Sequence, residues 1–234
     1  MSEALQVRRQ IVRYVAFKVR PEWRLLPESS RLEGKRAFSA VIDAARPQQP
    51  VLRTYSTVGM RADSDLLVWS VTWTLEDQRD LQARLQATSL GAYLDLAHSF
   101  LAMTKTSMYV DDHHHEGQEG TRTIVRPRNT KYLFVYPFVK TRPWYALPQE
   151  ERQRMMSQHI GYGHKYPSVT INTSYSFGLD DQEFVVAFET DSAADFLDLV
   201  MDLRMTRASE YTLRDTPILT GIAMSCGEAL DLLG

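Results

Sequence analysis

The sequence predicts an α+β fold in which two ferredoxin-like βαββαβ repeats form one duplicated barrel. The first observation behind this prediction is an internal repeat, because residues 55–94 and 175–211 both read as strand, Gly/Asp turn, strand and capped helix. The second is that both Asp-rich turns join runs enriched in β-branched and aromatic residues, which is typical of β-hairpins. Two such antiparallel sheets in one chain can face each other and bury their open faces.

Outwards from the repeated hairpins, each half gains the remaining elements of the repeat. In the first half, we expect a strand at 11–19, a helix at 34–45, a hairpin at about 51–73, a helix at 76–102 that could break near Gly91, and a strand at about 104–110. In the second half, we expect a strand at 131–140, a helix at 148–164, a hairpin at about 168–190, a helix at 192–210 and a strand at 217–225. The expected domains are residues 1–112 and 131–234, joined by a linker at 113–130.

The segment between the halves, which runs Asp111-Asp-His-His-His-Glu-Gly-Gln-Glu-Gly-Thr, is polar and contains glycine. This composition predicts a surface loop. Its three consecutive histidines also invite a metal-site hypothesis. Consecutive residues of an extended chain point in alternating directions, so a solvated loop is the favoured interpretation.

Composition describes an ordinary globular chain of 234 residues, 44% of them hydrophobic and 24% charged, with a net charge of −2. The near-neutral balance gives no electrostatic reason to expect nucleic acid or a membrane surface as a partner. No window approaches the ~18 apolar residues of a membrane span, and the first residues lack the apolar segment of a signal peptide. Cys226 is the only cysteine, which excludes a disulfide framework or a thiolate metal cluster. We therefore expect a cytoplasmic protein.

One histidine lies on the apolar stripe of the helix that starts at Pro148. Helical spacing places Arg152, Met155, Met156 and His159 on this stripe. A lone histidine beside methionines is more often a core residue. As a ligand, it would present a neutral imidazole from an apolar wall, as the axial ligand of a haem does. No second His, Asp or Glu shares the stripe at ligand spacing, which argues against a zinc or non-haem iron site.

The strand before this helix carries further candidates. Alternation puts Tyr132, Phe134 and Tyr136 on one face. Tyr136 is either a core tyrosine with a hydrogen-bonded hydroxyl or a redox-active phenol. Without other information, Lys140 reads as a solvated charge, and Trp144 in the following loop reads as a packing aromatic.

The segment Tyr136-Pro-Phe-Val-Lys140, the loop with Trp144 and the Pro-started helix with His159 together resemble the chlorite dismutase-like haem proteins. Within that family they resemble the coproheme decarboxylases. The apolar residue at position 171 and the strings Tyr132-Leu-Phe-Val-Tyr-Pro-Phe-Val and Asn172-Thr resemble an actinobacterial branch of them. The resemblance covers residues 130–234, and the first half supports it only through the repeat. It implies a homopentamer that uses hydrogen peroxide to convert iron-coproporphyrin III (coproheme) to protohaem (haem b), the last step of haem synthesis.

The resemblance also assigns roles to single residues. It implies His159 as the axial ligand of the porphyrin iron. It implies Tyr136 as the phenol that the peroxide-activated porphyrin oxidises and that then abstracts hydrogen from a propionate. Lys140 is implied as the partner of a propionate, since an ammonium group holds a carboxylate by a charge-assisted hydrogen bond. Trp144 and Met156 are expected to border the same pocket.

The distal side of the pocket, opposite the axial ligand, departs from true chlorite dismutases, which place an arginine there. In this sequence the equivalent position is Ile171. Alternation predicts two sets of side chains on this strand: Val169, Ile171 and Thr173 inward, and Thr170, Asn172 and Ser174 outward. An isoleucine cannot hydrogen-bond an oxychlorine anion, so chlorite decomposition is disfavoured.

Two features of the pocket stay open at this stage. The distal base of the resembled branch is a histidine of the interdomain loop, and the candidates here are Glu119 by spacing, His113, His114 and His115, or none. Coproheme carries four propionates, and the basic residues expected near them are Arg122, Arg126, Arg128 and Lys131. The alternatives to a decarboxylase are a haem peroxidase-like or chlorite dismutase-like enzyme and a non-catalytic haem-binding protein, all of the same fold.

Overall fold

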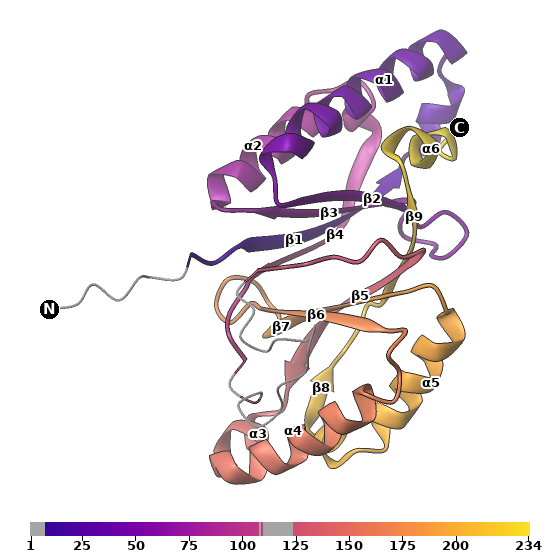
Figure 1. Ribbon diagram of the computed structural model, residues 1–234. Helices are drawn as coiled ribbons and strands as arrows, with labels where there is room; N and C mark the ends of the chain where they lie inside the picture. Colours follow the sequence, from indigo (N-terminus) through magenta and orange to yellow (C-terminus); the bar gives the residue numbers. More distant parts are fainter. Residues whose placement is uncertain (1–7, 108, 110–123) are drawn as a thin grey trace, which may run out of the picture.

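Each half of the chain builds an antiparallel sheet with helices on one face (Figure 1). The computed structural model describes residues 8–107, 109 and 124–234. The first half contains β1 (Ile11–Val19), α1 (Glu28–Ala45), β2 (Val51–Ser56), β3 (Leu66–Thr72), α2 (Leu75–Gln86) and β4 (Leu94–Met103). The second half contains β5 (Tyr132–Lys140), α3 (Arg142–Ala146), α4 (Gln149–Gly163), β6 (Thr170–Tyr175), β7 (Phe184–Thr190), α5 (Ala193–Arg204), β8 (Thr212–Arg214), β9 (Leu219–Met224) and α6 (Cys226–Asp231).

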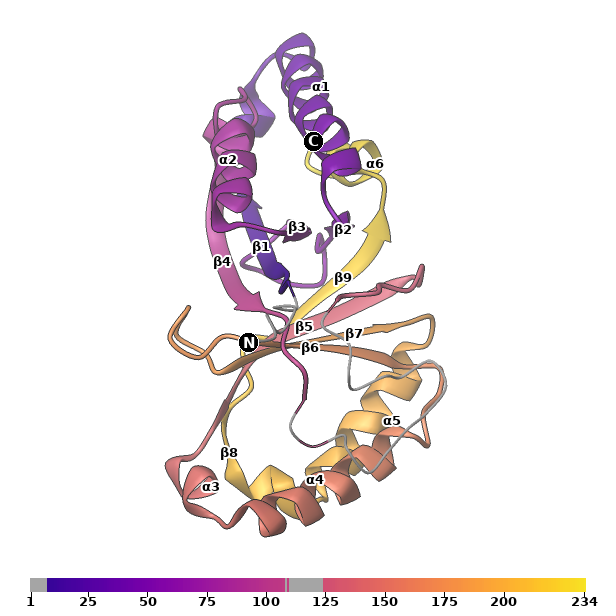
Figure 2. The same cartoon turned by 60° about the vertical axis from the view of Figure 1, so that its left-hand side comes forward.

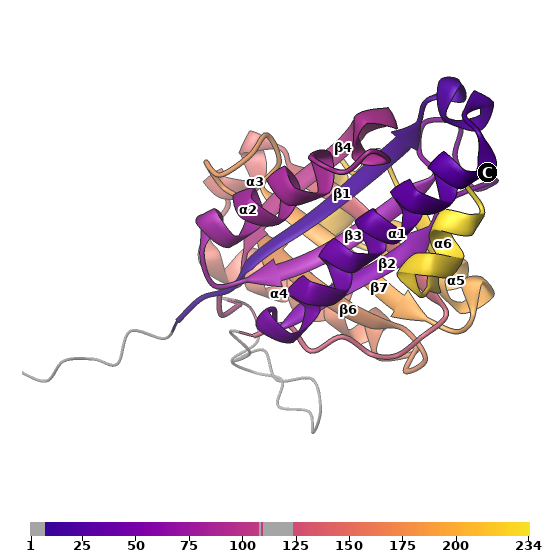
Figure 3. The same ribbon diagram turned by 90° about the horizontal axis from the view of Figure 1, so that it is seen from above.

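The strands close into a barrel. Their spatial order is β4-β1-β3-β2 in the first half and β6-β7-β5-β9 in the second, which is the ferredoxin-like order written twice. The sheets share both edges, because β2 pairs with β9 and Met103 of β4 pairs with Tyr175 of β6. Helices α1, α2 and α6 cover the first sheet, and α3, α4 and α5 lie beyond the second (Figures 2 and 3). The predicted duplicated α+β barrel is confirmed.

The faces that the sheets turn toward each other form a common core inside the barrel. Tyr14 and Trp69 stack there with ring centroids 5.3 Å apart. One buried carboxylate, Glu189 of β7, joins the halves by accepting hydrogen bonds from Arg53 Nη1 at 3.3 Å and from Asn172 Nδ2 at 2.9 Å. Burial raises the pKa of Glu189 to about 7. Because this core lies on one face of the second sheet and helices α4 and α5 lie on the other, the second sheet is covered on both faces.

The first strand and helix of the two halves can be compared residue by residue. β1 and β5 begin 121 residues apart (132 − 11), and so do α1 and α4 (149 − 28). The same offset joins Trp23 to Trp144 and Pro27 to Pro148, all of which lie just before the helices. Both tryptophans are buried. The repeat therefore extends through the elements in which the candidate site was predicted.

One prediction for the first half is wrong. Residues 94–103 form the strand β4, whereas the sequence predicts a helix over 76–102 and a strand at 104–110. The chain leaves the helix at Gln86 and turns so tightly at Gly91 that a Cβ there would lie 2.1 Å from the carbonyl oxygen of Leu85. β4 then pairs with β1, so tertiary pairing overrides the local helical pattern.

Smaller differences concern element ends. α1 begins at Glu28 rather than at residue 34, and the short helix α3 occupies the expected loop. α6 has no predicted counterpart; its Cys226 and Leu230 are buried between α1 and the first sheet, so the last residues pack on the first half. Most of the predicted linker lies outside the described residues. Among the helices of the described ranges, none is long and apolar enough to cross a membrane.

Candidate active site

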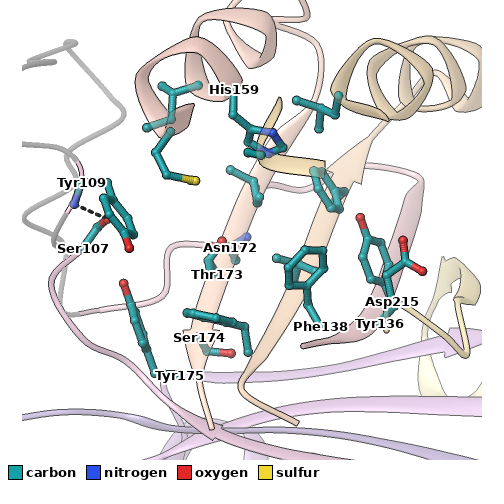
Figure 4. A pocket seen from close by; sticks show the side chains of 18 of the residues that line it. Ser107, Tyr109, Tyr136, Phe138, His159, Asn172, Thr173, Ser174, Tyr175 and Asp215 are labelled. Carbon is teal, nitrogen blue, oxygen red and sulfur yellow. Dashed lines mark hydrogen bonds between the residues drawn. The ribbon is translucent and has the colours of Figure 1, made fainter. Parts of the chain in front are cut away.

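A cavity of about 400 Å³ lies between the second sheet and helices α4 and α5 (Figure 4). Its walls are mostly apolar and come from β5, β6, β7 and both helices: Tyr136, Phe138, Met156, Ile160, Ile171, Phe188, Val200 and Leu203. Polar side chains converge on it as well, among them His159, Lys140 and Asp215. An apolar cavity with few, well-placed polar groups is the usual form of a cofactor or substrate site.

His159 reaches into this cavity from α4 (Figure 4). A hydrogen bond to Thr206 fixes its tautomer. Nδ1 of His159 lies 3.2 Å from Oγ1 of Thr206. The Thr206 hydroxyl donates its own proton to the backbone oxygen of Leu203 at 2.7 Å, so it must accept from the histidine. The ring proton is therefore on Nδ1, and Nε2 keeps its lone pair.

Electrostatics keep His159 in the form that binds metals. Burial, together with the nearby Lys140 ammonium, lowers the pKa of His159 to about 4. The imidazole is therefore neutral at neutral pH, as a metal ligand must be. Among the described residues, no group of three or more His, Cys, Asp or Glu side chains gathers as a protein metal cage would need. The donor set fits a metal that brings its other ligands with it, as porphyrin iron does.

Tyr136 borders the cavity from β5, with the carboxylate of Asp215 beside its ring (Figure 4). Its hydroxyl makes no hydrogen bond within the described part of the chain. Burial and the negative charge of Asp215 raise the pKa of Tyr136 well above its ordinary value of 10.0, against a smaller opposing effect of Arg204. Arg204, at the end of α5, forms an ion pair with Asp215. The phenol is thus held neutral beside a charged carboxylate.

Lys140 ends the same strand and is almost fully buried. Its Nζ donates a hydrogen bond to the backbone oxygen of Ala208 at 2.6 Å and lies 4.6 Å from the centre of the Trp144 ring. Burial lowers the pKa of Lys140 to about 8, although Glu183 opposes this effect. Lys140 therefore carries a charge at neutral pH in a place from which water is largely excluded.

The strand β6 forms the wall below His159 in Figure 4. Ile171 and Thr173 pair with Phe188 and Val186 of β7, and all four line the cavity. Ile171 is 48% exposed because it borders this open space. The residues predicted to point outward do not face solvent, because the other face of this sheet is the barrel interior: Thr170, Asn172 and Ser174.

Most of the predicted site residues meet at this cavity: Tyr136, Lys140, Trp144, Met156, His159 and Ile171. Three of the basic residues predicted near the propionates do not line it: Arg126, Arg128 and Lys131. The remaining predicted residues lie outside the described part of the chain: Arg122 and the distal-base candidates His113, His114, His115 and Glu119. Sequence reasoning missed four residues that only the fold brings here: Lys105, Arg204, Thr206 and Asp215.

Comparisons with known proteins agree with this architecture. Residues 16–224 match the family model for chlorite dismutase. A coproheme decarboxylase from Mycolicibacterium smegmatis is 34% identical over 172 residues, which are 73% of this chain and 72% of the relative. Chlorite dismutase from Candidatus Nitrospira defluvii in complex with imidazole has a TM-score of 0.85 at 24% identity, over 95% of this chain and 94% of that one. A mutant of the same enzyme gives a TM-score of 0.86 at 24% identity and the same coverage.

Proposed function

Since the chain belongs to the chlorite dismutase family, we propose that it is a coproheme decarboxylase, an enzyme that converts iron-coproporphyrin III to haem b. The observation that carries this proposal is that the Tyr136 phenol and the His159 imidazole border one apolar cavity. A histidine ligand alone would bind an iron porphyrin. The oxidisable phenol beside it adds a route by which the bound porphyrin can be changed.

The proposed reaction takes place twice on each substrate. A propionate loses one C–H hydrogen and its carboxylate, and it becomes a vinyl group. Each step consumes one hydrogen peroxide and one proton and releases one carbon dioxide and two waters, so atoms and charge balance. The bound iron porphyrin supplies the redox chemistry. The protein has to hold it, to place a propionate at the phenol, and to move protons.

We assign His159 to the iron and Tyr136 to the relay of an electron and a hydrogen atom. Thr206 holds the proton on Nδ1, so that Nε2 offers a lone pair from a neutral ring. Tyr136 is neutral and so has a hydrogen to give, and its hydroxyl is not engaged by another described side chain. A phenol that releases an electron and a proton can afterwards take a hydrogen atom from the propionate carbon.

The carboxylates of coproheme need cations, and the cavity offers Lys140, Lys105 and Arg204. Lys140 is the first candidate, because its buried ammonium group has a neutral carbonyl as its hydrogen-bond partner. A propionate in place of that carbonyl would make a charge-assisted hydrogen bond, which is about twice as strong as a neutral one. Trp144 packs over the same ammonium and would hold its direction.

Chlorite is not the proposed substrate. The wall of β6 presents Ile171 and Thr173 to the cavity, and isoleucine has no donor for a developing anion. Preorganised donors of that kind contribute about 3 kcal/mol, or roughly a hundredfold in rate. We therefore expect oxygen release from chlorite to be slow in the wild-type protein.

Three further assignments belong to the same proposal. We propose a homopentamer, for which the exposed apolar residues Leu197, Met201 and Met205 near α5 offer contact surface. We propose a cytoplasmic location, which a lone buried cysteine suits. We also propose the domain division 1–112, linker 113–130 and 131–234. Light scattering, cell fractionation and limited proteolysis test these three assignments in turn.

The test of the function is a titration of the purified protein with coproheme followed by hydrogen peroxide. Visible absorption reports binding, and mass analysis of the extracted porphyrin reports the number of propionates. We expect a Soret shift on binding and then stepwise loss of two carboxyl groups. A Soret shift without loss of carboxyl groups would leave a haem-binding protein, and rapid oxygen release from chlorite would indicate a dismutase.

A further inference from the structure

Oxidation of Tyr136 needs a base as well as an electron acceptor. A phenol that loses an electron becomes a strong acid, so its proton must pass to a nearby group. Because burial holds the pKa of Tyr136 far above neutral pH, the phenolate is not present beforehand. The proton therefore has to leave together with the electron, and the acceptor has to lie within reach of the hydroxyl.

We propose that Asp215 is this acceptor and takes the phenolic proton of Tyr136 whenever that tyrosine gives up an electron, an inference that rests on the proposed function. Figure 4 shows the Asp215 carboxylate beside the Tyr136 ring at the cavity wall. Of the two charged side chains that act on this phenol, Arg204 is a guanidinium and has no acceptor atom. Phe188, which stacks on the Tyr136 ring with centroids 5.9 Å apart, is a hydrocarbon ring and cannot accept a proton.

The fold keeps Asp215 in place from two directions. It directly follows β8, which pairs with β5, the strand of Tyr136, through Arg214 and Val139. From the other side, Arg204 of α5 holds the carboxylate in an ion pair. The Asp215 side chain is 17% exposed, so a proton received inside the cavity can pass on to water. These contacts hold the carboxylate beside the phenol and give the proton an exit. The two groups are not hydrogen-bonded to each other in this structure, so the proton would pass through one bridging water.

The step balances as follows. The O–H bond of Tyr136 breaks, its proton forms a new O–H bond on Asp215, and one electron leaves to the iron porphyrin that peroxide has oxidised. The resulting neutral phenoxyl would take a hydrogen atom from the propionate carbon, which restores the Tyr136 O–H bond. The carbon radical would then give its electron to the second oxidising equivalent that the peroxide supplies, and its bond to the carboxylate would break to release carbon dioxide and leave the vinyl group. Asp215 then gives its proton to solvent, which makes it ready for the second propionate.

The first test needs neither coproheme nor peroxide. In the haem-free protein, a flash-activated ruthenium polypyridyl oxidant generates tyrosyl radicals, and the contribution of Tyr136 is the difference from the Tyr136→Phe variant. We expect Asp215→Asn to slow the appearance of this radical about tenfold or more and to reduce its solvent deuterium isotope effect. Equal rates and equal isotope effects in both proteins would overturn the proposal, whatever the enzyme does with coproheme.

The second test follows turnover in the loaded protein. Asp215→Asn should slow decarboxylation about a hundredfold without weakening coproheme binding, because the change leaves Arg204 free for a propionate. Asp215→Glu should restore the rate to within about threefold, since it returns a carboxylate. Glu151→Gln is the matched control, because Glu151 also pairs with an arginine, Arg207, but does not line the cavity. A wild-type rate in Asp215→Asn, or equal losses in Asp215→Asn and Glu151→Gln, would contradict the assignment. If the wild type does not decarboxylate, the proposed function fails and the flash experiment alone decides on Asp215.

Discussion

The two halves of the barrel share one topology but differ in what lies between sheet and helices. In the first half, α1 and α2 pack directly on the sheet, and the space left beneath α2 is about 10 Å³. In the second half, the cavity between the sheet and α4 and α5 is about 400 Å³. The same arrangement of strands and helices thus encloses a filled core in the first half and an open cavity in the second.

The constant offset of 121 residues shows which side chains make the difference (159 − 38; 136 − 15; 140 − 19). His159 corresponds to Phe38, which is fully buried and meets Phe17 edge-on at a centroid distance of 6.4 Å. Tyr136 corresponds to Val15.

Lys140 corresponds to Val19, and both Val15 and Val19 belong to the core of the first half. Three apolar residues of the filled half therefore correspond to the three residues to which the proposed function assigns the iron, the phenol relay and a propionate. With the proposed function, the filled half would serve stability and the open half would hold the porphyrin.

The largest effect is expected for Tyr136→Phe, which removes the hydroxyl and makes this position apolar, as it is at the equivalent Val15. Coproheme should bind nearly as in the wild type, because the ring and its packing remain. Decarboxylation by peroxide should fall by at least about a thousandfold, since only the oxidisable hydroxyl is lost and this loss affects the chemical step. The measurement is porphyrin mass after peroxide addition. A normal yield of the two-propionate product would remove Tyr136 from the mechanism.

The reverse exchange, Phe38→His, should damage the fold rather than create a site. Phe38 packs within an apolar core cluster of the described residues, which would have to take up a polar imidazole, and the lost ring leaves a gap against Phe17. We expect the free energy of unfolding to fall by roughly 3 kcal/mol. Urea unfolding of the haem-free protein measures it, with Phe38→Leu as the control for lost volume. If the histidine variant were as stable as the leucine variant, the first half would be less tightly packed than it appears.

Acid should destabilise the haem-free protein through His159. Its folded-state pKa of about 4 lies below the ordinary 6.5, so the unfolded chain takes up the proton first as the pH falls. The stability contribution is complete above pH ~6.5 and is lost progressively down to about pH 4. Between pH 7 and 5, the wild type should lose roughly 1 to 2 kcal/mol more than His159→Phe.

The His159→Phe variant is needed as a reference, because Glu189 changes the stability in the opposite direction. Its pKa is raised to about 7 in the folded chain, so its contribution to stability increases as the pH falls. Glu189 contributes equally to both proteins and cancels in the difference. Urea unfolding curves at the two pH values provide the measurement. Parallel losses in both proteins would place the proton uptake elsewhere.

Much of this could be predicted from the sequence, and the failures have physical reasons. The strand with Tyr136 and the helix with His159 carry local signals, a run of β-branched and aromatic residues in one and a proline at the start of the other, so both elements were predictable. The strand β4 was not predictable, because residues 94–103 have no local strand signal and form a strand through pairing with β1.

The partners of the site residues were not predictable for a similar reason. Thr206 and Asp215 lie after α5 and after β8, in segments without periodicity, and they reach the cavity through tertiary packing. No motif in the sequence connects either of them to His159 or Tyr136. Local patterns thus reveal the residues that form elements, whereas the residues that position them become visible only in the folded chain.

The smallest effect is expected for Lys140→Val, which installs the residue found at the equivalent Val19. Loss of one cation should slow at least one of the two decarboxylations about tenfold, because one propionate is held less well. The haem-free protein should be at least as stable, since a buried charge is replaced by an apolar side chain. Accumulation of the three-propionate intermediate, followed by mass, is the readout. Unchanged rates of both decarboxylations would show that Lys140 does not hold a propionate and has a structural role.

His159 stands where the first half has the core residue Phe38, and we propose that this difference makes the second half a porphyrin site. The most direct measurement is coproheme binding to His159→Phe, followed by visible absorption in the ferric and ferrous states. The variant should fold. The cavity beside position 159 has room for a phenylalanine ring, and the first half already holds such a ring, that of Phe38, at the equivalent position. We predict that it loses the spectrum of an imidazole-bound iron and binds coproheme at least about tenfold more weakly. An unchanged spectrum and affinity would contradict the account and return His159 to the core.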